Sequence, residues 1–77
     1  MKVTIVSPEK SLYDNEAESV TVPGEKGCFE VLRNHAPIIS SLTAGTVLCK
    51  GEKPFSLKVS GGFIEVSRRE VSICVEI

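Results

Sequence analysis

The sequence lacks the features that mark several large classes of protein. Its 9 basic and 10 acidic residues are interspersed, and no block of like charge suggests a nucleic-acid groove or an anionic membrane surface. Its longest apolar runs fall far short of the roughly 20 residues that span a bilayer, so we expect no direct membrane insertion. A strand pattern starts at Lys2, without the apolar core or cleavage site of a signal peptide. We therefore expect one small domain over residues 1–77 and no nucleic-acid partner.

Patterns for metal binding and catalysis are also scarce. Cys28, Cys49 and Cys74 form no Cys-x-x-Cys pair, and a single histidine, His35, cannot complete the usual zinc patterns. We interpret the cysteines as reduced, small hydrophobic residues of a cytosolic protein. Nothing in the local sequence supports a Cys–His nucleophile. We expect no catalytic residue, no metal and no cofactor, with a small enzyme or metal protein as the minor alternative.

What the sequence does contain is a series of short strands. Apolar and polar residues alternate with a period of two, turn signals recur every few residues, and no window shows a helical face. This pattern predicts an all-β antiparallel sandwich or barrel. The predicted strands cover residues 2–6, 11–13, 17–22, 38–42, 46–50, 55–60, 63–66 and 71–77. The predicted core comprises Val3, Ile5, Val20, Val22, Phe29, Val31, Ile39, Val47, Leu57, Val59, Phe63, Ile64, Val71, Ile73 and Val75.

Residues 27–37 are the stretch where we would look first for a site. The preceding Pro23, Gly24 and Gly27 allow a sharp bend. The stretch itself is typical of neither a clean strand nor a plain loop. We expect His35 to be structural, with its ring bonded to backbone groups of the glycine bend. Elsewhere, the Gly61-Gly62 pair indicates a β-bulge or a close backbone approach rather than a phosphate loop.

Four segments together resemble one family. They are Val-Pro-Gly-Glu-Lys-Gly at 22–27, Asn-His-Ala-Pro-Ile-Ile at 34–39, Leu-Thr-Ala-Gly at 42–45 and Val-Ser-Gly-Gly-Phe-Ile-Glu-Val at 59–66. In this order and spacing they are similar to the epsilon subunits of bacterial F-type ATP synthases. The resemblance implies a flattened antiparallel β-sandwich of about ten short strands. An unrelated small cytosolic β-sandwich that acts as a protein-binding adaptor is the alternative.

The resemblance also implies a function. It predicts a non-catalytic rotor subunit of the central stalk, peripheral at the cytoplasmic face of the bacterial inner membrane, that couples proton flow to ATP synthesis. Its partners would be the gamma subunit and the membrane c-ring, with the alpha and beta subunits reached through the complex. The candidates for the ring-facing loop are Glu25, Lys26, Gly27, Cys28, Glu30, Arg33 and His35. The candidates for the gamma contact are Phe55, Leu57, Val59 and Phe63.

The chain departs from the family pattern at several places. Many members carry glycine where this chain has Glu30, Pro-Gly or similar at its Arg33-Asn34, and Asn or Gly in the last hairpin at its Arg68-Arg69. The ring-facing loop is therefore expected to be more charged. Members also usually continue into a C-terminal helical hairpin, whereas this sequence stops at Ile77. On that ground we expect no ATP binding and no block of hydrolysis from this chain.

Overall fold

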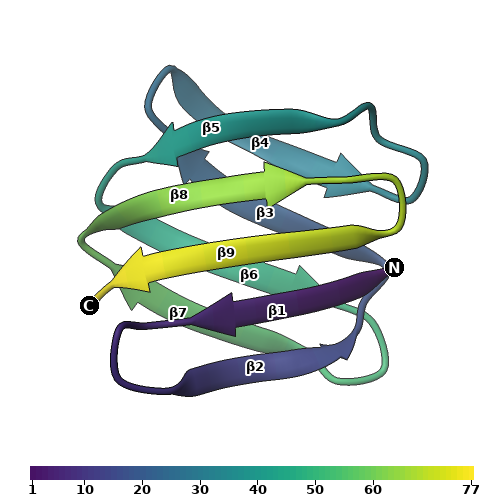
Figure 1. The fold of residues 1–77 in the computed structure, drawn as a ribbon, viewed down its shortest axis with the longest axis horizontal. Coiled ribbons are helices and arrows are strands. Elements are labelled where there is room, and N and C mark those ends of the chain that lie inside the picture. The colour runs from purple at the N-terminus through teal and green to yellow at the C-terminus, as the bar shows by residue number, and fades with distance from the viewer.

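The computed structural model describes all of residues 1–77 as nine β-strands without a helix (Figure 1). The structure thus contains no helix long and apolar enough to cross a membrane. The strands are β1 (Lys2–Val6), β2 (Ser11–Glu16), β3 (Ser19–Gly24), β4 (Gly27–Leu32), β5 (Ile38–Leu42), β6 (Gly45–Lys50), β7 (Phe55–Val59), β8 (Gly61–Val66) and β9 (Glu70–Glu76). The prediction of an all-β protein is confirmed.

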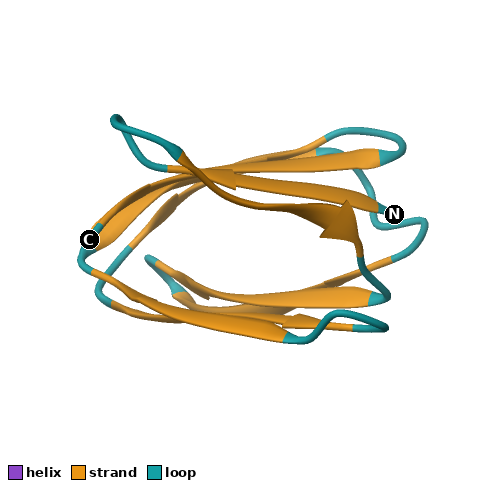
Figure 2. Cartoon of the chain, turned by 90° about the horizontal axis from the view of Figure 1, so that it is seen from below, coloured by secondary structure: helices purple, strands orange, loops and turns teal.

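The strands form one continuous sheet that folds back on itself into two layers (Figure 2). One layer has the order β2-β1-β9-β8-β5, and the other has β4-β3-β6-β7. The layers are joined where Gly24 of β3 pairs with Leu42 of β5. The overall extents of 26 × 25 × 17 Å describe a flattened sandwich, since two packed sheets lie about 10 Å apart.

The pairing differs from the expectation in one respect. We predicted antiparallel strands throughout, and the structure has one parallel pair, β1 with β9, in which Val3 faces Val71. A parallel pair needs a long connection between its strands, and here nearly the whole chain connects them. Local turn signals describe only neighbouring hairpins, so they carry no information about this pair. The sheet is therefore mixed, with nine strands where about ten were expected.

The core lies between the two layers. Eleven of the fifteen predicted core residues are buried, and Phe29 and Leu57 are partly buried against them. The prediction omitted Tyr13, Ala17, Leu42 and Val66, and treated Cys49 only as a small hydrophobe. The full set of buried hydrophobic residues is Val3, Ile5, Tyr13, Ala17, Val20, Val22, Val31, Leu42, Val47, Cys49, Val59, Ile64, Val66, Val71, Ile73 and Val75.

The prediction that Phe63 and Ile39 lie in the core is wrong. Phe63 is 49% exposed and Ile39 is 74% exposed. Adjacent residues of a strand point to opposite faces, and Ile64 takes the inward position on β8, so Phe63 must point outward. Ile39 lies opposite Glu65 of β8, and directly opposed residues share a face, which here is the outer one. Truncating Phe63 is therefore expected to cost much less stability than a core position would.

The stretch 27–37 is more regular than expected in its first half. β4 pairs with β3 along its whole length, from Gly24 opposite Gly27 to Ser19 opposite Leu32. Gly27 has a positive φ of 127°, which makes the tight hairpin possible. After β4 the chain turns at Asn34, whose φ is 72°, and reaches β5 through residues 35–37.

Candidate functional site

The β3–β4 hairpin turn carries the first group of ring-facing candidates. Glu25, Lys26, Gly27 and Cys28 are all exposed at this turn. The turn is anchored to β5, because the Glu25 amide donates to the Ser41 carbonyl at 3.1 Å and the Thr43 amide donates to the Pro23 carbonyl at 2.8 Å. These hydrogen bonds hold the turn in place, and its charged side chains are exposed to a partner.

The second group lies at the other end of β4. Arg33 is exposed and His35 is half-buried just after the strand, while Glu30 projects from its middle. Six residues of extended strand separate Gly27 from Arg33 by about 20 Å. The structure therefore does not bring the seven ring-facing candidates together in one loop. The sequence suggested a single loop because we did not recognise 27–32 as a regular strand.

His35 does not hold the glycine bend. Its ring nitrogen Nδ1 lies 2.7 Å from the carbonyl oxygen of Ala36, and its amide donates to the Leu32 carbonyl at 3.1 Å. The ring thus contacts only local backbone, and the predicted bond to the bend is wrong because β4 separates the two. What His35 stabilises is the turn between β4 and β5.

The four gamma-contact candidates differ in accessibility. Val59 is buried in the core, and Phe55 and Leu57 are half-buried against it. Phe55 stacks on Tyr13, with ring centroids 4.9 Å apart. Tyr13 in turn donates from its hydroxyl to the Lys53 carbonyl at 2.8 Å. Only Phe63 offers a large accessible apolar surface.

Phe63 belongs to an apolar strip across the outer face of the larger layer. The register places Cys74 of β9 beside Phe63, and Val6 of β1 beside Cys74. A shallow hollow next to Phe63 is lined by Val6, Pro8, Gly62, Cys74 and Val75. The exposed Ile39 lies on the same face, on β5. Sequence reasoning missed this strip because its members come from four strands, only some of them consecutive in the chain.

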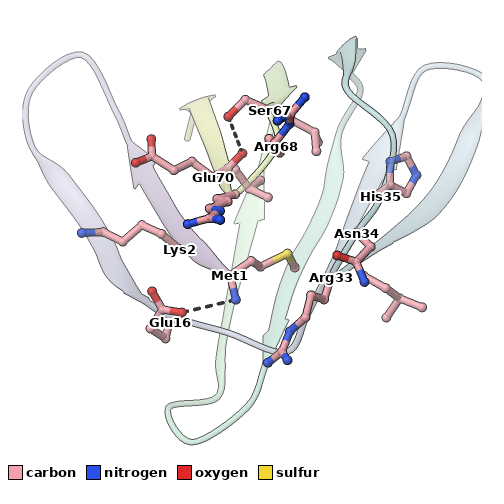
Figure 3. Close-up of a pocket in the computed structure, with 13 residues that line it drawn as sticks. Met1, Lys2, Glu16, Arg33, Asn34, His35, Ser67, Arg68 and Glu70 are labelled. Atoms are coloured by element: carbon pink, nitrogen blue, oxygen red, sulfur yellow. Dashed lines mark hydrogen bonds and ion pairs between the residues drawn. The ribbon is translucent and has the colours of Figure 1, made fainter.

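A second concave feature lies at the end of the sandwich where β4 ends and β9 begins (Figure 3). It is a groove of about 460 Å³ between the β4–β5 turn and the β8–β9 turn. Figure 3 shows Arg33, Asn34 and His35 on one wall and Ser67, Arg68 and Glu70 on the facing wall. The β8–β9 turn is held by the Ser67 amide and hydroxyl, which both donate to the Glu70 carbonyl.

The groove contains two ion pairs at its edge. The Lys2 ammonium lies 3.1 Å from Asp14, and the hydrogen bond and charge of that carboxylate raise the pKa of Lys2. The amino group of Met1 lies 3.3 Å from Glu16. No group of three or more His, Cys, Asp or Glu side chains is placed to hold a metal ion.

The sequence is similar to those of known ATP synthase subunits. The chain matches the family model described as the ATP synthase Delta/Epsilon chain beta-sandwich domain over residues 1–77. It is 46% identical to the ATP synthase epsilon chain of Leptospira borgpetersenii serovar Hardjo-bovis, with 99% of this chain and 61% of that protein aligned. It is 38% identical to the epsilon chain of Dehalococcoides mccartyi, with 99% and 55% aligned. The chain thus spans little more than half the length of these relatives.

Solved structures share the fold. The central stalk and c-ring structure of Tetrahymena thermophila mitochondrial ATP synthase contains a chain that matches with a TM-score of 0.86 at 14% identity, covering 99% of this chain and 63% of the other. A chain of the Euglena gracilis mitochondrial enzyme matches with a TM-score of 0.86 at 23% identity, covering 95% and 48%. Together with the match along all of residues 1–77, the two-layer sandwich assigns this chain to the family of β-sandwich domains of ATP synthase delta and epsilon chains.

Proposed function

We propose that this chain is the β-sandwich of a rotor subunit in the central stalk of an F-type ATP synthase. It links the gamma subunit to the c-ring, performs no chemistry itself, and lies peripherally at the cytoplasmic face of a bacterial inner membrane. The observation that carries the proposal is the family match over the whole of residues 1–77. Coupling rotation to ATP synthesis requires a rigid connector that binds two partners, and the sandwich offers one apolar and one polar surface.

The first surface is the apolar strip around Phe63, which we assign to gamma. A permanent interface buries about 1,600 Å² in total, or about 800 Å² on each partner. The chain exposes 4934 Å², so such an interface would cover about one sixth of it. An exposed aromatic side chain on the outer face of a sheet is suited to anchor an interface of this size. The other gamma candidates do not extend this strip, because Phe55, Leu57 and Val59 lie on β7 of the other layer and pack in or against the core.

The second surface is the β3–β4 turn, which we assign to the polar loops of the ring. Glu25 and Lys26 stand at its tip, with Glu30 further along β4. Charged residues at the edge of an interface mainly determine how the two partners align and how fast they associate. The turn adjoins the Phe63 strip at β5, because Ile39 of the strip also lines a hollow with Glu25 and Lys26. The two partners would therefore bind neighbouring surfaces.

The test is a charge reversal in the assembled synthase. The triple variant Glu25→Lys, Lys26→Glu, Glu30→Lys should lower proton-driven ATP synthesis in membrane vesicles while leaving ATP hydrolysis by the soluble catalytic core unchanged. Glu9→Lys, in the exposed β1–β2 turn, changes the net charge by the same amount and should leave coupling intact.

Phe63→Glu tests the gamma surface separately. Because Phe63 is already half exposed, the chain should still fold, but it should no longer co-purify with the gamma subunit. If deletion of the chain left proton-driven synthesis at its normal level, the rotor function would be refuted.

A further inference from the structure

All three arginines of the chain line the single groove between the β4–β5 and β8–β9 turns. Arg33 comes from one layer of the sandwich, and Arg68 and Arg69 come from the other, 35 positions later in the sequence. The six lysines are distributed differently, since only Lys2 lines this groove. The fold therefore concentrates its guanidinium groups at one end of the molecule.

These three guanidinium groups have no anionic partner in the protein. The structure contains two ion pairs, and both occupy other groups, Lys2 with Asp14 and the amino group of Met1 with Glu16. Glu70 is the remaining carboxylate of the groove, and it forms no ion pair. Three like charges around one hollow repel each other, and a bound anion would relieve that repulsion.

We propose that this groove is a binding site for a phosphate-bearing anion with several charges. Arginine presents its donors as a rigid fork that matches the oxygens of phosphate, whereas lysine acts as a point charge. The groove's volume of about 460 Å³ falls within the usual range of small-molecule sites. The proposal is independent of the rotor function.

The arrangement favours phosphate over carboxylate. A single carboxylate offers two oxygens in one plane, and one arginine fork can engage both of them. Here the arginines stand on two turns, Arg33 on one and Arg68 and Arg69 on the other, so a ligand that bridges them must present oxygens in several directions. Tetrahedral phosphates, and above all linked phosphates, do this. The phosphate can belong to a soluble polyphosphate or to a lipid headgroup, and binding to vesicles separates the two.

The backbone of both turns is already ordered for this role. The Lys2 amide donates to the Arg69 carbonyl at 3.2 Å, which fixes the β8–β9 turn to β1. The His35 amide fixes the β4–β5 turn to the end of β4. Binding would therefore order mainly the exposed arginine side chains, which keeps the entropic cost low.

The experiment is an NMR titration of the ¹⁵N-labelled chain with sodium tripolyphosphate. Saturable shifts should appear at the arginine side chains and at the amides of residues 33–35 and 67–70, and not at the β3–β4 turn. Replacing all three arginines by glutamine should weaken binding at least tenfold, and replacing them by lysine about threefold or more. The matched control replaces the exposed Lys10, Lys50 and Lys58 by glutamine, with the same loss of charge, and should change affinity less than about twofold.

Two further experiments identify the class of ligand. If the chain co-sediments with phosphatidylglycerol vesicles but not with phosphatidylcholine vesicles, and the three arginines are required, the ligand is a lipid phosphate. If it sediments with neither, the ligand is a soluble phosphate. Equal affinity for citrate would overturn the phosphate assignment. Shifts that do not saturate, shifts that map elsewhere, or an equal loss in the lysine control would overturn the site. The NMR shifts are mapped on the wild-type chain alone. They can therefore refute the proposed site even if the arginine variants do not fold.

Discussion

Gly62 is the position where a single methyl group should be most damaging. Its φ is 139°, a conformation that residues with a side chain rarely adopt. A Cβ atom built there would also overlap the carbonyl oxygen of Cys74 on the neighbouring β9 and lie 3.0 Å from the Cα of Val75. Both neighbours are backbone atoms of paired residues in the β8–β9 ladder, so neither can move aside without disrupting pairing.

The expected loss is large for a domain of this size. Backbone strain of this kind costs about 1–3 kcal/mol. Forcing the strands apart adds a further amount of about 1–3 kcal/mol, as overpacking does. We expect Gly62→Ala to lower the free energy of unfolding by about 3–5 kcal/mol, whereas the whole domain should have only about 4–12 kcal/mol. The melting temperature should fall by at least roughly 12 °C.

Substitutions at two other glycines separate the cost of backbone strain from the cost of the added methyl group. Gly27 also has a positive φ, of 127°, but a Cβ there would meet nothing within 4 Å, so Gly27→Ala tests backbone strain alone. Gly61 has an ordinary φ, and its Cβ would make contacts of 3.6 and 3.8 Å, so Gly61→Ala tests the added methyl group alone.

Urea unfolding followed by circular dichroism gives the three values, provided that the slope with denaturant is unchanged. We expect the loss to increase from Gly61→Ala to Gly27→Ala to Gly62→Ala. If Gly62→Ala cost no more than Gly27→Ala, the close approach of β8 and β9 would not be the reason for this glycine.

Three other perturbations test the core and its thiols. Ile64→Ala, at a fully buried position, should cost about 2–5 kcal/mol, whereas Phe63→Ala, one residue away on the outer face, should cost about 1 kcal/mol; equal losses in thermal unfolding would contradict the assigned faces. Burial raises the pKa of Cys49 from its usual value near 9 to about 11. The stability associated with the protonated thiol is complete below pH 9 and is lost as pH rises towards 11, because only the unfolded chain ionises in that range. Relative to Cys49→Val, the wild type should therefore lose on the order of 1–2 kcal/mol between these pH values, and parallel curves would contradict this. At about pH 8, below the usual thiol pKa, a thiol reagent should label the exposed Cys28 first and leave Cys49 unmodified until the chain unfolds.

Much of the local structure followed from the sequence because its causes are local. Period-two alternation placed most strands, and glycine and proline marked the turns. The resemblance to the epsilon subunits rested on the same turn and strand motifs, so the family could be identified without coordinates. The close backbone approach at Gly62 was also foreseen from the Gly-Gly pair, since a glycine inside a strand pattern often marks a place where another backbone comes near.

The tertiary structure alone decided which residues meet. Alternation defines two faces of a strand but does not say which faces the core, and for this reason Phe63 and Ile39 were assigned inward when they lie outward. Pairing of β1 with β9 joins the two ends of the chain, which no local signal describes. Regular pairing of β4 separated the proposed ring-facing residues into two groups. The same strand carried Arg33 to the end of the sandwich where the β8–β9 turn presents Arg68 and Arg69. Contacts between residues distant in sequence depend on how the layers pack, and only the folded chain determines that packing.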